Sequence, residues 1–114
     1  MIAYKLMRKM KDGYSPLFIN KKQRLQAGIP YMAENVPTKG FKERFGWHCT
    51  LAPVAPHLRS DKLSGRVWVK VKLDGEIHIY DRPESQGGQW VLCTGNMTIL
   101  DELTEDEVNA LQSM

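Results

Sequence analysis

Residues 66–72 alternate strictly between valine and larger or charged side chains, and this alternation constrains the fold more than any other feature of the chain. A period of two is typical of a β-strand with one buried face. We expect Val67, Val69 and Val71 to point inward and Trp68 to point outward with its charged neighbours. A strand buries its apolar face only within a larger layered structure, so the chain must supply further strands.

A second alternating segment follows at residues 76–80. A two-residue Asp-Gly turn between the segments would set valines opposite polar residues, whereas a three-residue loop, Leu73–Gly75, repairs the register. The expected hairpin pairs Val71 with Ile77. It places His78 on the outer face, where a catalytic role is not expected.

Shorter apolar segments separated by turn residues predict the other strands. Thr104-Glu105-Asp106-Glu107 is a capping box that opens a helix ending near Gln112. Residues 20–25 are expected to form an exposed turn and residues 35–45 a surface loop. The sequence therefore predicts a single α+β domain over residues 1–114, with a short C-terminal helix and a mostly antiparallel, strongly bent sheet of about six to eight strands. The additional strands are expected near residues 2–10, 17–19, 29–34, 47–51, 89–94 and 97–100.

Composition and termini favour a soluble protein. The apolar fraction of 42% and charged fraction of 25% are ordinary for a globular domain. No apolar run approaches the roughly 18 residues of a membrane span, and Met1 leads directly into charged residues without a signal peptide. Cys49 and Cys93 lie outside any C-x-x-C pattern, which favours buried thiols in the cytoplasm over a disulfide.

The charge is unevenly distributed along the chain. Residues 1–50 contain ten Lys and Arg against three Asp and Glu, whereas residues 51–114 contain six against ten. A basic half predicts nucleic-acid or phosphate partners, although solvated lysines would give the same count. Nucleic-acid binding would need a continuous basic face with exposed aromatic rings such as Trp68 or Tyr14.

The stretch Gly46–Leu58 concentrates candidate site residues, including two of the three histidines. Strand alternation puts His48 and Cys49 on opposite faces, which disfavours a metal site built from them. His48-Cys49-Thr50-Leu51 matches the H-x-T-L element of two-histidine phosphoesterases, but that chemistry needs a second such motif. Two readings remain for His48: it binds a ligand, or it is a hydrogen-bonded structural imidazole.

Residues 81–88 form the second polar stretch, rich in donors and acceptors. Gly87-Gly88 would let backbone amides approach a phosphate, yet the segment matches neither the P-loop nor the dinucleotide fingerprint, so a plain connection is the alternative. Arg8 ends the first strand and would point inward as an anion ligand if the Tyr4 face is buried; the alternative is an edge position with its guanidinium in water. The predicted ligand site, with no metal and no cofactor, comprises Arg8, Arg44, Trp47, His48, His57, Glu84, Ser85 and Gln86.

A family resemblance runs through nearly the whole chain. Its motifs are Gly46-Trp47-His48 with Pro53, Ala55 and His57, then Arg66-Val67-Trp68, Trp90-Val91-Leu92 and Leu103–Val108. With these motifs the chain resembles small uncharacterised proteins of bacteriophages and integrated mobile elements. The resemblance implies the cytoplasm of a bacterial host and an accessory role, such as action against host defences.

A more distant analogy concerns ADP-ribosyltransferases. An inward Arg8, a Gly-aromatic-His strand and a later Glu84 are similar to the groups that hold NAD in that fold, although its Ser-rich second motif is missing. Three functions follow as hypotheses. The first is a non-enzymatic phage or mobile-element protein that binds a nucleotide-like ligand or a host protein. The second is an enzyme acting on a nucleotide by NAD cleavage or ADP-ribosyl transfer, and the third is nucleic-acid binding.

Overall fold

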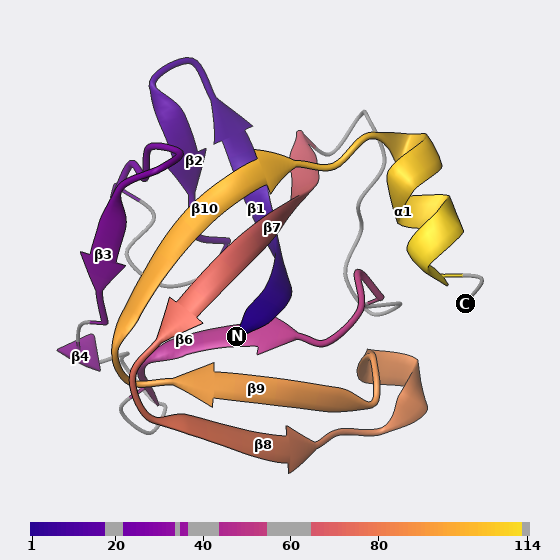
Figure 1. Ribbon diagram of the computed structural model, residues 1–114. Coiled ribbons are helices and arrows are strands. Elements are labelled where there is room, and N and C mark those ends of the chain that lie inside the picture. The colour runs from indigo at the N-terminus through magenta and orange to yellow at the C-terminus, as the bar shows by residue number, and fades with distance from the viewer. Residues whose placement is uncertain (18–21, 34, 37–43, 55–64, 113–114) are drawn as a thin grey trace.

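The computed structural model describes residues 1–17, 22–33, 35–36, 44–54 and 65–112. Its main sheet has eight antiparallel strands, and a short C-terminal helix follows the last of them (Figure 1). The α+β class and the strongly bent antiparallel sheet are thereby confirmed. The main-sheet strands are β1 (Ile2–Met10), β2 (Gly13–Ser15), β3 (Pro30–Met32), β6 (Trp47–Thr50), β7 (Arg66–Asp74), β8 (Ile77–Asp81), β9 (Gln89–Cys93) and β10 (Asn96–Glu102), and the helix is α1 (Glu105–Gln112).

The strands of the main sheet follow the order β3-β10-β7-β1-β6-β9-β8, and β2 pairs with β1 as a hairpin. β2 is a strand that the sequence did not predict. Of the strand predicted at 17–19, Leu17 lies outside any strand, and residues 18 and 19 lie outside the described part. Two further strands, β4 (Asn35–Val36) and β5 (Arg44–Phe45), form a separate pair at the ends of the segment that was predicted to be a loop. No helix in the described part is long and apolar enough to cross a membrane.

A single long hairpin builds most of the sheet. β7 and β8 form one arm and β9 and β10 the other. Their pairing keeps one register from Val71–Ile99 to Asp81–Gln89, and it shifts by one residue between Ile99 and Asp101. In that register Gly75 lies opposite Gly95 at the point where the ribbon bends. The two backbones touch there, because a Cβ on Gly75 would lie 2.7 Å from the Cα of Gly95. Glycine at both positions therefore lets the ribbon turn sharply, and its two halves run in different directions (Figure 1).

The predicted hairpin between residues 66–72 and 76–80 is wrong. Val71 pairs with Ala3 of β1 and Ile99 of β10, while Ile77 pairs with Cys93 of β9. Asp74-Gly75 is a bend within one arm of the ribbon, and the true hairpin connection is the glycine-rich stretch 82–88. A local turn pattern cannot distinguish a bend within a strand from a hairpin turn. Here the pairing of β7 with β10 and of β8 with β9 decides that Asp74-Gly75 is a bend.

The sheet has an apolar core on each face. The face that carries Val69, here the Val69 face, packs against residues from the β2–β3 connection, including the fully buried Leu25. The opposite face, here the Trp68 face, is partly covered by α1 through Val108 and Leu111. Trp68 is therefore only 5% exposed, and the prediction that it points to solvent is wrong. The Val69-face core comprises Ala3, Met7, Leu25, Ala33, Trp47, Cys49, Val69, Val71, Leu73, Val91, Cys93, Met97 and Ile99.

The start of α1 confirms the capping box. The hydroxyl of Thr104 accepts a hydrogen bond from the backbone N–H of Glu107 at 3.2 Å, and the Glu107 carboxylate accepts one from the Thr104 N–H at 3.2 Å. These two reciprocal bonds satisfy N–H groups that the first helical turn leaves without partners. The cap thus fixes where α1 begins, and Val108 and Leu111 pack the helix against the cluster that contains Trp68.

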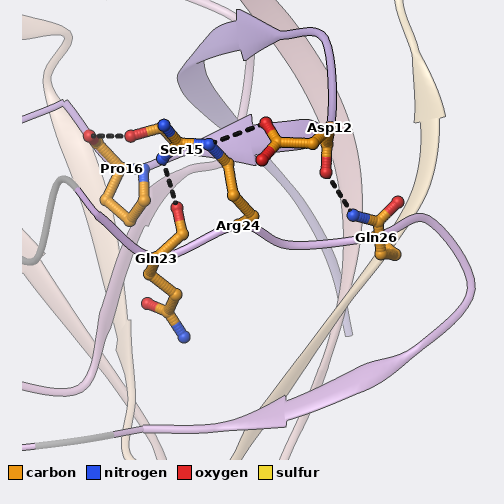
Figure 2. A network of polar contacts seen from close by, with 6 residues as sticks. All are labelled: Asp12, Ser15, Pro16, Gln23, Arg24 and Gln26. Atoms are coloured by element: carbon orange, nitrogen blue, oxygen red, sulfur yellow. Dashed lines mark hydrogen bonds and ion pairs between the residues drawn. The ribbon is translucent and has the colours of Figure 1, made fainter.

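The segment after β2 is held against the first hairpin. The Arg24 Nε donates to the Asp12 carboxylate at 2.9 Å, and the Gln26 amide donates to the Asp12 carbonyl (Figure 2). Tyr14 and Leu25 exchange backbone hydrogen bonds beside this network. Residues 22–26 are therefore not simply an exposed turn, because Leu25 enters the Val69-face core.

Candidate functional site

Five side chains from five neighbouring strands form a row across the Trp68 face. Residues directly opposite each other in an antiparallel pair share a face, so the register alone aligns them. The row reads Lys70 (β7), Tyr4 (β1), Thr50 (β6), Trp90 (β9) and Tyr80 (β8).

His48 joins the end of this row. It lies on the same face two residues before Thr50, and its Nδ1 is 2.8 Å from the Tyr80 hydroxyl. The two rings meet edge to face, with centroids 5.9 Å apart. His48 is half-buried, whereas Trp47 and Cys49 are buried on the Val69 face. The predicted alternation of this strand is therefore confirmed, and it separates the imidazole from the Cys49 thiol.

Arg82 lies over the aromatic end of the row. Its guanidinium carbon is 4.7 Å from the Trp90 ring centroid and 5.6 Å from that of Tyr80. The indole Nε1 of Trp90 donates to the carbonyl of Gln86 at 2.7 Å, so the hairpin connection folds back onto the ring. Among the residues that the structure describes, no carboxylate forms an ion pair with Arg82. A half-buried guanidinium is thus held mainly by two aromatic rings.

The hairpin connection also contacts the segment that follows β6. The main chain of Gly87 approaches that of Val54 so closely that a Cβ on Gly87 would lie 2.5 Å from the Val54 carbonyl oxygen. From the other side, the Gln112 amide of α1 donates to the carbonyl of Pro53 at 2.7 Å. These contacts hold residues 51–54 between the connection and the end of the helix.

Lys5 supports His48 from the opposite face. β1 and β6 share one register pair, Tyr4 with Thr50, and the Lys5 ammonium donates to the His48 carbonyl at 2.8 Å. Burial lowers the pKa of Lys5, while burial raises the pKa of the neighbouring Cys49 thiol to about 11. The Lys5 ammonium thus adds a side-chain hydrogen bond between β1 and β6, at the main chain of His48.

The predicted arginines do not join this cluster in the described part. Arg8 is exposed, and it lies four residues along β1 from Tyr4, a separation of about 13 Å. Of the two readings of Arg8, the exposed position at the strand end is therefore confirmed and the inward one is not, because the apolar cover of the Trp68 face ends before the strand does. Arg44 belongs to β5, but its side chain lies outside the described atoms, and His57 lies outside the described residues.

The remaining predicted site residues, Trp47, Glu84, Ser85 and Gln86, lie at different distances from the cluster. Glu84 and Ser85 are exposed on the short 3-10 helix η2 (Glu84–Gln86), and Gln86 contributes its carbonyl oxygen. Trp47 is buried and donates its indole N–H to the carbonyl of Tyr31 at 3.1 Å, so it has a structural role. Of the predicted residues whose side chains the structure describes, His48 lies in the cluster and Gln86 bonds to it through its carbonyl oxygen.

Sequence reasoning missed four residues of the site: Lys5, Tyr80, Arg82 and Trp90. For Lys5 a signal existed, because it lies in phase with Ala3 and Met7 on the apolar face of its strand. The others come together only through the pairing of β8 with β9, which the sequence analysis did not predict.

Comparisons of the chain with protein-family models, with curated proteins and with solved structures give no match. The candidate functional site is the cluster of His48, Tyr80, Arg82 and Trp90.

Proposed function

We propose that this chain binds a nucleotide-like small molecule at the cluster of His48, Tyr80, Arg82 and Trp90. The observation that carries the proposal is the half-buried Arg82, stacked on aromatic rings with no carboxylate ion pair among the described residues. Stacking engages the flat face of a guanidinium, and its in-plane N–H donors match the oxygens of a phosphate. The cluster thus provides an anion-binding group beside aromatic surface.

The half-buried rings of Tyr80 and His48 would contact the base of a nucleotide, while Arg82 binds its phosphate. Trp90 is 8% exposed, so a base would stack on Tyr80 or contact the His48 imidazole instead. A planar base and a phosphate in one molecule would use both kinds of group together. The sequence resembles small proteins of phages and mobile elements, and in such a protein this binding would serve an accessory role against host defences.

The alternative functions have less support. An NAD-cleaving enzyme would need Glu84 and Arg8 beside the ligand, but Glu84 is exposed on η2 and Arg8 lies far along β1 from the row. Binding of nucleic acid by exposed aromatics is disfavoured because Trp68 is buried and the Tyr14 hydroxyl donates to Glu102 at 2.9 Å. Binding of a host protein remains the second reading of the same surface.

The proposal is tested by isothermal titration of the full chain with AMP, ADP, NAD, adenosine and inorganic phosphate. Arg82→Gln should weaken nucleotide binding by roughly 10- to 100-fold, because a charge-assisted hydrogen bond contributes about 1.5–3 kcal/mol. Arg8→Gln is the matched control, since it removes an exposed arginine from the same face and should leave binding unchanged. Absence of heat with every nucleotide, or equal losses in both variants, would refute the proposal.

Incubation with NAD separates binding from catalysis. Loss of intact NAD that Glu84→Gln abolishes would favour the enzyme, whereas NAD recovered unchanged alongside measurable binding would favour a binding protein. Chromatography of the incubated mixture measures both outcomes.

A further inference from the structure

The two edges of the sheet are built differently. β3 has three residues and begins with Pro30, which has no backbone N–H to offer a neighbouring strand. β8 has five residues, contains no proline and pairs with β9 without a bulge. Exposed edges usually carry such interruptions because their unpaired backbone groups attract other strands. β8 lies along the outer margin of the sheet in Figure 1, and it lacks them.

The hydrogen bonds at the two ends of β8 show which backbone groups face outward. The Thr94 N–H donates to the carbonyl of Glu76, and the Arg82 N–H donates to the carbonyl of Gly88. Even-numbered residues of this strand therefore bond to β9. Since the direction alternates along an antiparallel strand, Ile77, Ile79 and Asp81 direct their N–H and C=O groups to the open edge.

The side chains along this edge are complementary to themselves. In an antiparallel pair centred on Ile79, this 58%-exposed side chain meets its own copy. Glu76 of each chain then lies opposite Arg82 of the other, and no like charges face each other. Opposite charges across a strand pair stabilise it. Arg82 would gain a carboxylate partner that the described part of its own chain does not supply.

We propose that β8 pairs with β8 of a second copy of this chain, in the register centred on Ile79, and continues the sheet across a two-fold axis. The outward groups of three residues in each chain exchange hydrogen bonds, and the same patch serves both copies, as a two-fold interface requires. A strand pair of this length buries less than the roughly 1,200 Å² of a stable interface, so the dimer is weak and depends on concentration. The strand pair shares Arg82 with the proposed ligand site, but the sedimented mass reports dimer formation whether or not a ligand binds.

Sedimentation velocity of the full chain from micromolar to millimolar concentration tests the dimer. The average mass of the wild type should rise toward that of two chains. Ile79→Lys should remain a single chain, because it sets two ammonium groups against each other at the axis. Met32→Lys is the matched control on the other edge, where Met32 is 72% exposed, and it should behave as the wild type. Wild type that stays at one-chain mass, or Ile79→Lys that still dimerises, would overturn the proposal.

A charge exchange tests the register. Glu76→Arg and Arg82→Glu each place like charges opposite each other in the homodimer, so each variant alone should stay at one-chain mass. Mixed in equal amounts, the two variants restore an acid opposite a base at both ends, and the mass should rise to that of two chains. A mixture that stays at one-chain mass would overturn the register. Circular dichroism of each variant confirms that the sheet is intact.

Discussion

Replacing Gly95 with alanine tests whether contact between two glycine backbones produces the bend of the sheet. A Cβ at this position would lie 2.0 Å from the carbonyl oxygen of Asp74, a backbone atom that cannot rotate away. The φ angle of Gly95 is not in the left-handed region, so the substitution adds a clash without backbone strain. Gly28→Ala is the opposite case, because Gly28 has a φ of +83° and nothing within 4 Å of an added Cβ.

The two effects have different expected sizes. A left-handed conformation costs an alanine about 1–2 kcal/mol, and forced overpacking typically costs about 1–3 kcal/mol. Because the clash at Gly95 is with backbone, we expect a loss of about 3 kcal/mol there and about 1 kcal/mol at Gly28. Gly75→Ala combines a φ of +126° with a contact of 2.7 Å, so it should lose at least as much as Gly95→Ala.

Urea unfolding followed by tryptophan fluorescence measures these losses through the midpoint and its slope. A domain of this size has about 5–15 kcal/mol of stability, so the variants should remain folded without denaturant. If Gly95→Ala loses no more stability than Gly28→Ala, the backbone contact does not determine the bend, and the reasoning from the facing glycines is refuted.

Three further predictions concern individual side chains. Burial raises the pKa of Cys49 from 9.0 to about 11, so the unfolded chain loses this proton first and the free energy of unfolding should fall as pH rises through that range. The free energy of unfolding should fall by up to about 3 kcal/mol. Urea titrations at several pH values should show a smaller fall in Cys49→Ala, and an equal fall would show that Cys49 is not its cause. Tyr80→Phe removes the hydrogen bond to His48 and should cost about 1 kcal/mol. The ¹⁵N shifts of the imidazole should change with it, and unchanged shifts would argue against the pair. Thr104→Ala removes the cap of α1 and should lower Tm by about 4–8 °C, because a lost cap costs about 1 kcal/mol. Glu107→Ala keeps the Thr104 hydroxyl as acceptor and should lower Tm less.

Local patterns predicted the elements of this fold. Alternation in residues 66–72 identified β7, and the capping box at Thr104 identified the helix and its start. The faces of β6 were also predicted, because the period of two depends only on the geometry of a single strand. Each of these features is determined within a few residues along the chain, so it can be read without knowing what lies beside it.

The tertiary structure decided which strands pair and which side chains meet. Asp74-Gly75 favours a hairpin by itself, but Gly95 of a distant segment turns it into a bend. Trp68 lies on the predicted outward face, and α1 buries it. Arg82 and Tyr80 meet Trp90 only because β8 pairs with β9. A strand is stabilised by partner strands that lie far away in the sequence. The residues next to His48, Tyr80, Arg82 and Trp90 in the sequence therefore do not determine that these four side chains meet.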